Sequence, residues 1–408
     1  MSQTLTAPTG EDEAAAGEPL AEASEETATD GELAIDRLIQ AGDLSGEALD
    51  RFIAEHSFPI LEGSSVTFVY RGEADGVLLQ HFIYGLETSQ AFQRIEGCDL
   101  WYLVLDLPRA SHLQYKINVL HGENQNWILD PLNAQRALDP FGANSVVRSF
   151  GTERPAWTFP DSEARPGRIV EASIESAAFG GSRQVQIYLP ARFRPSRRYP
   201  LLVVHDGRDY MRFSSLGTVL DNLIHQLEVA PMIVALTNAE ERLEEYPDHH
   251  PHAEFLTDEL VPWLEKAYPL RPEPSARGLM GASFGAVASL SCAWRNPGVY
   301  GRLLLQSGSF AFTDIGQHQR GPAFDPVVKF VNAFRKKPGR PSEKVFVSCG
   351  TYESLIYENR SMVPLLQATG MDVRYVEARD GHNWENWRDR LREGLSWLFP
   401  GPLWMVYE

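Results

Sequence analysis

Gly281-Ala-Ser-Phe-Gly285 is the stretch of the sequence that decides the fold. It has the form G-x-S-x-G, follows a short apolar run over 277–280 and precedes the small, apolar residues of 286–293, which are typical of a helix. A strand, a sharp turn and a helix in this order form a nucleophile elbow, in which two glycines let the chain pass close to itself. We therefore expect Ser283 in a strained backbone conformation at the end of a parallel sheet, with the start of the next helix facing its hydroxyl.

The second half of the chain alternates between strand-like and helical segments. Apolar runs that predict buried strands occur at 185–189, 201–205, 232–236, 303–306, 345–348 and 373–376. Helical patterns lie between them, at 216–228, 252–267, 285–295, 325–335, 358–369 and 384–398. This alternation predicts a doubly wound α/β-hydrolase domain over residues 151–408.

The first half is organised differently. Residues 61–150 contain short alternating strands, such as 66–70, separated by turn residues, which predicts a small antiparallel β-sandwich domain. Residues 36–60 predict one or two short amphipathic helices. Residues 1–35 include nine acidic residues between Glu11 and Glu32 and no Lys or Arg, so we expect a disordered acidic tail.

Composition limits the classes of function. The net charge is −18, and the tail supplies about half of it, but the remainder is still acidic, which argues against a nucleic-acid partner. No apolar run is long enough for a membrane span, and the N-terminus does not resemble a secretory signal. Three widely spaced cysteines cannot form a disulfide framework, so we expect a reducing compartment, the cytoplasm.

The chain gives no sign of a cofactor or a metal. The paired glycines at Gly180 and Gly181 lack the third glycine and the strand context of a dinucleotide site. The histidines at 249, 250 and 252 could in principle bind a metal, but without helical carboxylate–histidine spacing a polar loop is the better interpretation. We expect neither a cofactor nor a metal site.

A serine hydroxyl needs a base, and the base needs an acid that fixes its tautomer. In the α/β-hydrolase arrangement the chain order is serine, acid, histidine. His382 follows the last predicted strand and is the candidate base. The candidate acid is Glu353, the first carboxylate after the preceding strand, with Glu358 and Asp380 as alternatives.

Two loops are expected to complete the site. The oxyanion should be bound by backbone N–H groups of Phe284 and of Gly207 or Arg208, in the loop after an early strand. The loop 237–246 carries Arg242, Glu245 and Tyr246 at the edge of the sheet where ligands bind, so these residues are either a substrate pocket or solvated surface.

Taken together, these stretches resemble the enterochelin (enterobactin) esterases, within the esterase-D-like group. The resemblance covers about residues 60–400 and rests on segments in matching order, which are His205–Gly207, Arg242 with Glu245, Gly281–Gly285, Gln306–Phe310, Gly350–Glu353, Asp380–His382 and Trp387–Arg388. In the first half, 66–68, 97–101, Tyr115 and 130–133 resemble that family's immunoglobulin-like, early-set domain.

The resemblance implies a small-molecule ester substrate, a ferric catechol trilactone siderophore, cleaved in the cytoplasm to release iron. It implies Ser283 as nucleophile, His382 as base and Glu353 as acid, with the sandwich domain helping to cover the site. Arg208, Arg212 and Arg242 would be the cations that pair with an anionic substrate.

Two other hypotheses stay open. An early-set domain can bind glucan through exposed aromatic residues, here Trp101 or Trp127, which would suit an esterase for an acylated carbohydrate, although Trp101 is better explained as a core residue. The second is a non-catalytic binding protein that kept the hydrolase fold.

Overall fold

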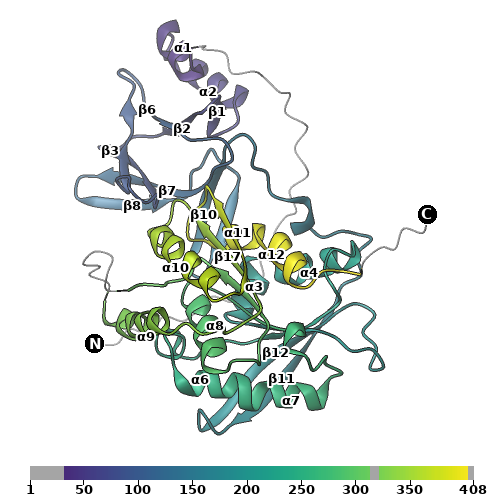
Figure 1. Ribbon diagram of the computed structural model, residues 1–408. Helices are drawn as coiled ribbons and strands as arrows, with labels where there is room; N and C mark the ends of the chain where they lie inside the picture. Colours follow the sequence, from purple (N-terminus) through teal and green to yellow (C-terminus); the bar gives the residue numbers. More distant parts are fainter. Residues whose placement is uncertain (1–31, 313–320, 403–408) are drawn as a thin grey trace.

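The computed structural model describes residues 32–312 and 321–402, in which an antiparallel β domain packs against an α/β domain (Figure 1). The α/β domain is built on one sheet with the strand order β11-β12-β14-β13-β15-β16-β17-β18. Its strands are β11 (Arg168–Ser176), β12 (Gly181–Leu189), β13 (Leu201–Val204), β14 (Ile233–Leu236), β15 (Arg277–Ala282), β16 (Arg302–Gln306), β17 (Lys344–Gly350) and β18 (Asp372–Ala378). The six strands from β13 to β18 are parallel, and β11 and β12 add an antiparallel edge.

Helices cover both faces of this sheet, which is why its central strands are continuous apolar runs. Leu202 and Val204 of β13 pack in one hydrophobic cluster and Leu201 and Val203 in the other. The first cluster involves α3 (Gly207–Phe213), α4 (Leu216–His225), α11 (Trp384–Asp389) and α12 (Leu391–Leu398). The second involves α6 (His250–Glu254), the π-helical turn Phe255–Leu260, α7 (Val261–Ala267), α8 (Phe284–Arg295), α9 (Asp325–Lys336) and α10 (Ile356–Ala368). A short helix, α5 (Arg242–Glu245), lies in the loop after β14.

The first half forms two antiparallel sheets. One has the order β1-β2-β6-β5, and the other has the order β4-β3-β7-β10-β9 with β8 paired to β7. Their bounds are β1 (Ile60–Glu62), β2 (Ser65–Arg71), β3 (Gly76–His81), β4 (Ser89–Ala91), β5 (Gln93–Arg94), β6 (Leu100–Asp106), β7 (His112–His121), β8 (Asn124–Ile128), β9 (Arg136–Asp139) and β10 (Gly142–Arg148). Phe68 and Tyr115 meet edge to face between the sheets, with ring centroids 4.9 Å apart. The predicted fold class, an antiparallel β domain before an α/β domain, is confirmed.

Two helices precede the sandwich, α1 (Ala34–Ala41) and α2 (Gly46–Glu55). They pack on the outer face of the first sheet, where Ile35 and Phe52 join Val69 and Leu100 in one cluster. The predicted boundary between tail and helices, after residue 35, is therefore two residues late, because Ala34 and Ile35 are already helical and buried. The rest of the predicted tail, residues 1–31, lies outside the described residues.

The two tryptophans considered for glucan binding differ in exposure. Trp101 is 6% exposed and its Nε1 donates to the Gly72 carbonyl at 3.1 Å, which makes it a core residue. Trp127 on β8 is 51% exposed.

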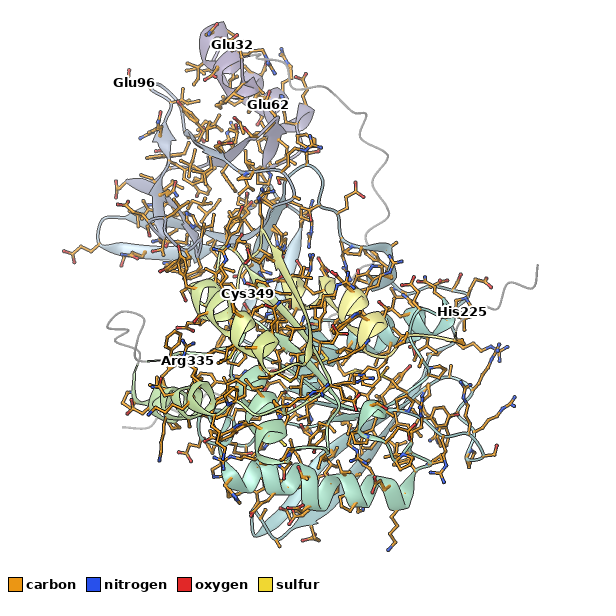
Figure 2. The ribbon with its side chains drawn as sticks, viewed as in Figure 1. Glu32, Glu62, Glu96, His225, Arg335 and Cys349 are labelled. Carbon is orange, nitrogen blue, oxygen red and sulfur yellow. The ribbon has the colours of Figure 1, made fainter. Side chains whose placement is uncertain are left out.

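The sandwich contacts the α/β domain where β17 and β18 end. The amide of Tyr84 donates to the carbonyl of Tyr352 at 2.8 Å, and the amide of His112 donates to the carbonyl of Arg379 at 2.9 Å. In Figure 2, Cys349 near the carboxyl end of β17 lies at the level where the two domains meet. Among the described residues, no helix is both long and apolar enough to cross a bilayer.

Candidate active site

The turn from β15 into α8, residues Gly281–Gly285, is the elbow that the sequence predicts. Ser283 has φ 57° and ψ −121°, a positive-φ conformation that non-glycine residues rarely adopt. A Cβ atom on Gly281 would lie 2.4 Å from the backbone of Gly285, so only glycine allows the two segments to come this close. The turn is fixed by a hydrogen bond from the Ser283 amide to the Gln306 carbonyl, 2.9 Å long.

His382 and Glu353 are hydrogen-bonded to each other. The distance from His382 Nδ1 to Glu353 Oε2 is 2.7 Å, the Glu353 side chain is fully buried, and the His382 side chain is 38% exposed. Because the ionised carboxylate can only accept, Nδ1 carries the proton and Nε2 is left to act as a base. The three candidate acids differ in their surroundings: Glu353 bonds to His382, Asp380 bonds to His112, and Glu358 lies within α10.

Burial of Glu353 is balanced by further donors. Oε1 accepts from Ser307 Oγ at 2.6 Å, from the Gly350 amide at 2.8 Å and from Asn386 Nδ2 at 3.2 Å. Trp387 supports the arrangement from α11, because its Nε1 donates to Ser307 Oγ and its ring meets the His382 ring at 89°. A buried carboxylate with this many donors is held in one orientation.

Sheet register brings these loops together. β15, β16, β17 and β18 are parallel neighbours, so their carboxyl ends lie at one edge. The pairing continues past the strands, since the Ser307 amide donates to the Ser348 carbonyl and the Thr351 amide to the Ala378 carbonyl, both at 2.7 Å. Residues distant in sequence thus meet because four strand ends are aligned.

Ser309 is a site residue that the sequence analysis missed. Within the described residues, the side-chain hydrogen bond of Ser283 Oγ is to Ser309 Oγ, at 3.1 Å. The preceding residue, Gly308, is held by Asn359, which accepts from its amide at 3.1 Å and donates to its carbonyl at 2.9 Å. The position of Ser309, three residues after a strand next to the elbow strand, is the signal that could have identified it.

The predicted oxyanion donors have different environments. The amide of Phe284, the first residue of α8, has no acceptor among the described residues and is available to a ligand. The prediction for Gly207 is corrected, because its amide donates to the Thr237 carbonyl at 2.9 Å. Gly207 is glycine for a packing reason, since a Cβ there would lie 2.5 Å from Leu236 Cβ. The amide of Arg208 donates to Asn238 Oδ1 at 3.1 Å. Its role as an oxyanion donor remains a prediction, and it requires the Asn238 side chain to move away from this amide.

Arg242 reaches the elbow. Its guanidinium binds both carboxylate oxygens of Asp206, at 2.9–3.0 Å, and its Nη2 donates to the Ala282 carbonyl at 3.4 Å, next to Ser283. It also lies 5.9 Å from the centre of the Phe284 ring. Arg242 is therefore at the site, with its charge neutralised by Asp206.

The structure corrects the predicted substrate contacts of Glu245 and Tyr246, because both side chains are buried. Glu245 Oε1 accepts from the Arg183 guanidinium and from the amides of Glu240 and Glu241, and the Tyr246 hydroxyl accepts from the Asp206 amide. Arg212 is exposed at the end of α3, with its guanidinium 5.1 Å from the Phe213 ring centre, and its substrate contact remains a prediction.

The histidine-rich segment is helical, which corrects the predicted polar loop. His252 lies on α6, buried, with its Nε2 3.0 Å from Nε2 of His205. Burial lowers the pKa of His205 to about 4 and that of His252 well below its usual value, so both imidazoles are neutral at pH 7. In the described ranges, no three His, Cys, Asp or Glu side chains are grouped as metal ligands.

Comparisons with known proteins agree with this geometry. The family model described as "Putative esterase" matches residues 176–398. The iron(III) enterobactin esterase of Dickeya dadantii is 22% identical over 76% of this chain and 80% of that protein. An endo-1,4-beta-xylanase/feruloyl esterase of Xylanibacter ruminicola is 25% identical over 57% of this chain and 31% of that protein.

A solved structure shows the same fold. The crystal structure of the enterobactin esterase from Shigella flexneri, in the presence of enterobactin, has a TM-score of 0.66 and 21% identity. The match covers 82% of this chain and 92% of that chain, so it includes the sandwich domain as well as the α/β domain.

Replacing Gly281 with Ala tests the elbow. The added Cβ would clash with the Gly285 backbone, so we expect Gly281→Ala to lower the free energy of unfolding by about 1–3 kcal/mol, measured by urea denaturation. Gly181→Ala is the matched control, because no atom lies within 4 Å of its added Cβ, and we expect a change of no more than about 1 kcal/mol. Equal stability of the two variants would contradict the close approach at the elbow.

Replacing Glu353 with Gln tests the acid. Loss of the carboxylate removes the acceptor that fixes the His382 tautomer, so kcat for 4-nitrophenyl acetate should fall about 10⁴-fold. Glu377→Gln, which changes a partly exposed carboxylate paired with Arg360, should stay near wild type. A Glu353→Gln variant with more than a tenth of wild-type kcat would exclude Glu353 as the acid.

Proposed function

We propose, on the premise that this chain belongs to the esterase family and is a carboxylic ester hydrolase, that it hydrolyses the ester bonds of a siderophore of the enterobactin type through an acyl-enzyme on Ser283. The observation that carries the proposal is the bond between His382 and Glu353 at the same sheet edge as the strained elbow. The names of two relatives support the substrate, since the Dickeya dadantii and Shigella flexneri proteins, each matched over most of its length, are enterobactin esterases.

The proposed reaction uses groups that lie in the loops after β15, β16, β17 and β18. Ser283 Oγ leaves Ser309, transfers its proton to His382 Nε2 and attacks the ester carbonyl. The amide of Phe284, at the positive end of α8, stabilises the developing oxyanion, with the amide of Arg208 as the second proposed donor. The alcohol leaves with the proton from His382, and water, activated by the same imidazole, releases the acid from Ser283.

Glu353 keeps its hydrogen bond to His382 throughout this cycle and does not take the serine proton. Its charge stabilises the imidazolium that forms when His382 takes the serine proton, and its three other donors keep it aligned. We place the reaction in a reducing compartment, the cytoplasm, a proposal consistent with the free thiols of Cys98, Cys292 and Cys349.

Exposed aromatic side chains near the site suit a substrate with an aromatic acyl group. Tyr84 and Tyr357, 46% and 52% exposed, form what we call the aromatic ledge. The rings of Tyr84 and Tyr357 meet at 70°, with centroids 5.9 Å apart, one from the sandwich and one from α10. The amide of Tyr84 donates to the carbonyl of Tyr352, the residue before Glu353. Tyr357 is two residues before Asn359, whose side chain accepts from the amide of Gly308, next to Ser309.

A second candidate shares the aromatic acyl group. Asp206 neutralises Arg242, so few cations remain for a highly charged ferric complex, and one relative is a feruloyl esterase. An ester between an aromatic acid and a carbohydrate is therefore the alternative substrate. Relative kcat/KM values for a ferric catechol trilactone and a feruloyl oligosaccharide, measured in parallel, decide between the two.

Ser283→Ala tests the mechanism. Without the nucleophile, kcat for 4-nitrophenyl acetate should fall by at least about 10³-fold while the thermal unfolding midpoint is retained. Ser396→Ala, which changes a serine on α12 whose hydroxyl donates to the Glu393 carbonyl at 3.4 Å, is the matched control and should keep wild-type activity. Undiminished turnover by Ser283→Ala would rule out the proposed acyl-enzyme.

Tyr84→Ala and Tyr357→Ala test the aromatic ledge. Loss of one ring should raise KM for the better aromatic substrate about 3- to 10-fold and leave KM for 4-nitrophenyl acetate, which is too small to span the ledge, nearly unchanged. Trp127→Ala removes an equally exposed ring elsewhere on the sandwich and should change neither value. Unchanged KM in both tyrosine variants would remove the ledge from the substrate site.

A further inference from the structure

His112 joins the two domains through both of its ring nitrogens. It is the first residue of β7 in the sandwich and is 3% exposed. Nδ1 lies 2.8 Å from Asp380 Oδ1, and Nε2 lies 3.0 Å from Glu385 Oε2. Both partners belong to the α/β domain, on either side of His382 in the sequence.

Asp380, which contacts His112, is also hydrogen-bonded to the loop that carries His382. Its Oδ1 also accepts from the Gly381 amide at 2.7 Å and from Asn383 Nδ2 at 2.8 Å. Its carbonyl accepts from the Tyr352 amide at 3.1 Å, directly before Glu353. Asp380 therefore holds residues that are adjacent in sequence to His382 and to Glu353, the two partners of the hydrogen bond in the site.

The network closes on the acid itself. Asn383 Oδ1 accepts from the Asn386 amide at 2.9 Å and so caps α11. Asn386 Nδ2 then donates to the Gly381 carbonyl at 2.9 Å and to Glu353 Oε1 at 3.2 Å. A continuous set of hydrogen bonds runs from His112 through Asp380 to the carboxylate that orients His382.

We propose that His112 is a positioning residue, which holds Asp380 and thereby keeps the His382 loop in its catalytic geometry. The sandwich domain is then part of the catalytic apparatus and does more than cover the site. The inference rests on the proposed role of His382 in ester hydrolysis.

The two contacts require both ring nitrogens to donate. Each faces a carboxylate oxygen, and a neutral imidazole has only one N–H, so His112 is an imidazolium in this geometry. Burial alone disfavours that charge, but the charge of Asp380 and the hydrogen bonds to Asp380 and Glu385 outweigh it and raise the pKa of His112 to about 9. The charged and titratable groups around the ring are Arg148 on β10, Tyr352 after β17, Glu377, Arg379 and Asp380 at the end of β18, and Glu385, Arg388, Asp389 and Arg390 in and after α11.

The sign of the pH dependence follows. The pKa is raised on folding, so the contribution of His112 is complete below the unfolded-state value of about 6.5 and is lost as pH rises through about 9. Activity of the wild-type chain should therefore fall on the alkaline side, because a neutral His112 points an unprotonated ring nitrogen at one of the two carboxylates and is repelled by it.

Two amide substitutions separate the contacts. The side-chain nitrogen of Asn overlaps Nδ1 of histidine, and that of Gln overlaps Nε2, so His112→Asn keeps a donor for Asp380 and His112→Gln keeps one for Glu385. We expect kcat for 4-nitrophenyl acetate to stay within about threefold of wild type in His112→Asn and to fall about 10- to 100-fold in His112→Gln, with KM changed less than about threefold in both. His112→Asn should also lose the alkaline limb of the wild-type kcat profile.

Tyr115→Phe is the matched control. It lies on the same strand and breaks a buried bond to Asp130, 2.6 Å long, without touching the catalytic loops, so kcat should be unchanged even if the domain is less stable. Equal kcat in His112→Gln and His112→Asn, or the same loss in Tyr115→Phe, would overturn the proposal. If a His112 variant does not fold, a wild-type kcat that stays flat from about pH 7 to about pH 10 overturns it as well.

The wild-type chain, measured in the same assay, distinguishes failure of the proposed ester hydrolysis from failure of the positioning role of His112. Absence of ester hydrolysis by the wild type would refute the proposed function. Hydrolysis by the wild type with unaffected His112 variants would refute only the positioning role.

Discussion

The bond between His382 Nδ1 and Glu353 Oε2 is the interaction on which the site depends. The Glu353 side chain is fully buried. Burial of a carboxylate costs free energy unless both of its oxygens accept hydrogen bonds. Ser307, Gly350 and Asn386 supply the other donors, from the ends of β16 and β17 and from α11. The positions of these three elements are therefore constrained by one ionised group.

Backbone strain is concentrated at the same edge of the sheet. Asp206, Ser283 and Ser307 follow β13, β15 and β16, and each has a positive φ without being glycine. Such conformations cost of order 1–3 kcal/mol each and persist only where the surroundings determine them. Here bonds between adjacent strand ends hold them, such as that from the Ser283 amide to the Gln306 carbonyl. These conformations turn the three side chains towards their partners at the carboxyl edge of the sheet, which are Arg242 for Asp206, Ser309 for Ser283 and Glu353 for Ser307.

The sequence alone was sufficient to predict the features that depend on local residue patterns and on the order of segments along the chain. The elbow depends on glycine spacing, and the loops that hold His382 and Glu353 follow predictable strands, so their proximity could be anticipated before any coordinates. The edge strand β11 and the helix α3 were not predicted, because β11 is largely polar and exposed and α3 is only seven residues long.

Hydrogen-bond partners could not be read from the sequence. Gly207 and Glu245 lie in the expected loops, but their polar groups are bonded to Thr237 and Arg183, which depends on tertiary packing. His112 lies far from the catalytic loops in the sequence and has no motif around it, so only the docking of the domains reveals its partners. The predicted division of the chain into domains thus does not specify which residues make the contacts between them.

Ester hydrolysis by this chain requires Ser283 to be an activated nucleophile. The most direct measurement is mass spectrometry of the wild-type chain after treatment with a fluorophosphonate, followed by peptide mapping, because only an activated serine reacts readily with this probe. We expect a single phosphonyl adduct, located on Ser283. An unmodified chain, or an adduct on Ser309 with Ser283 free, would contradict it.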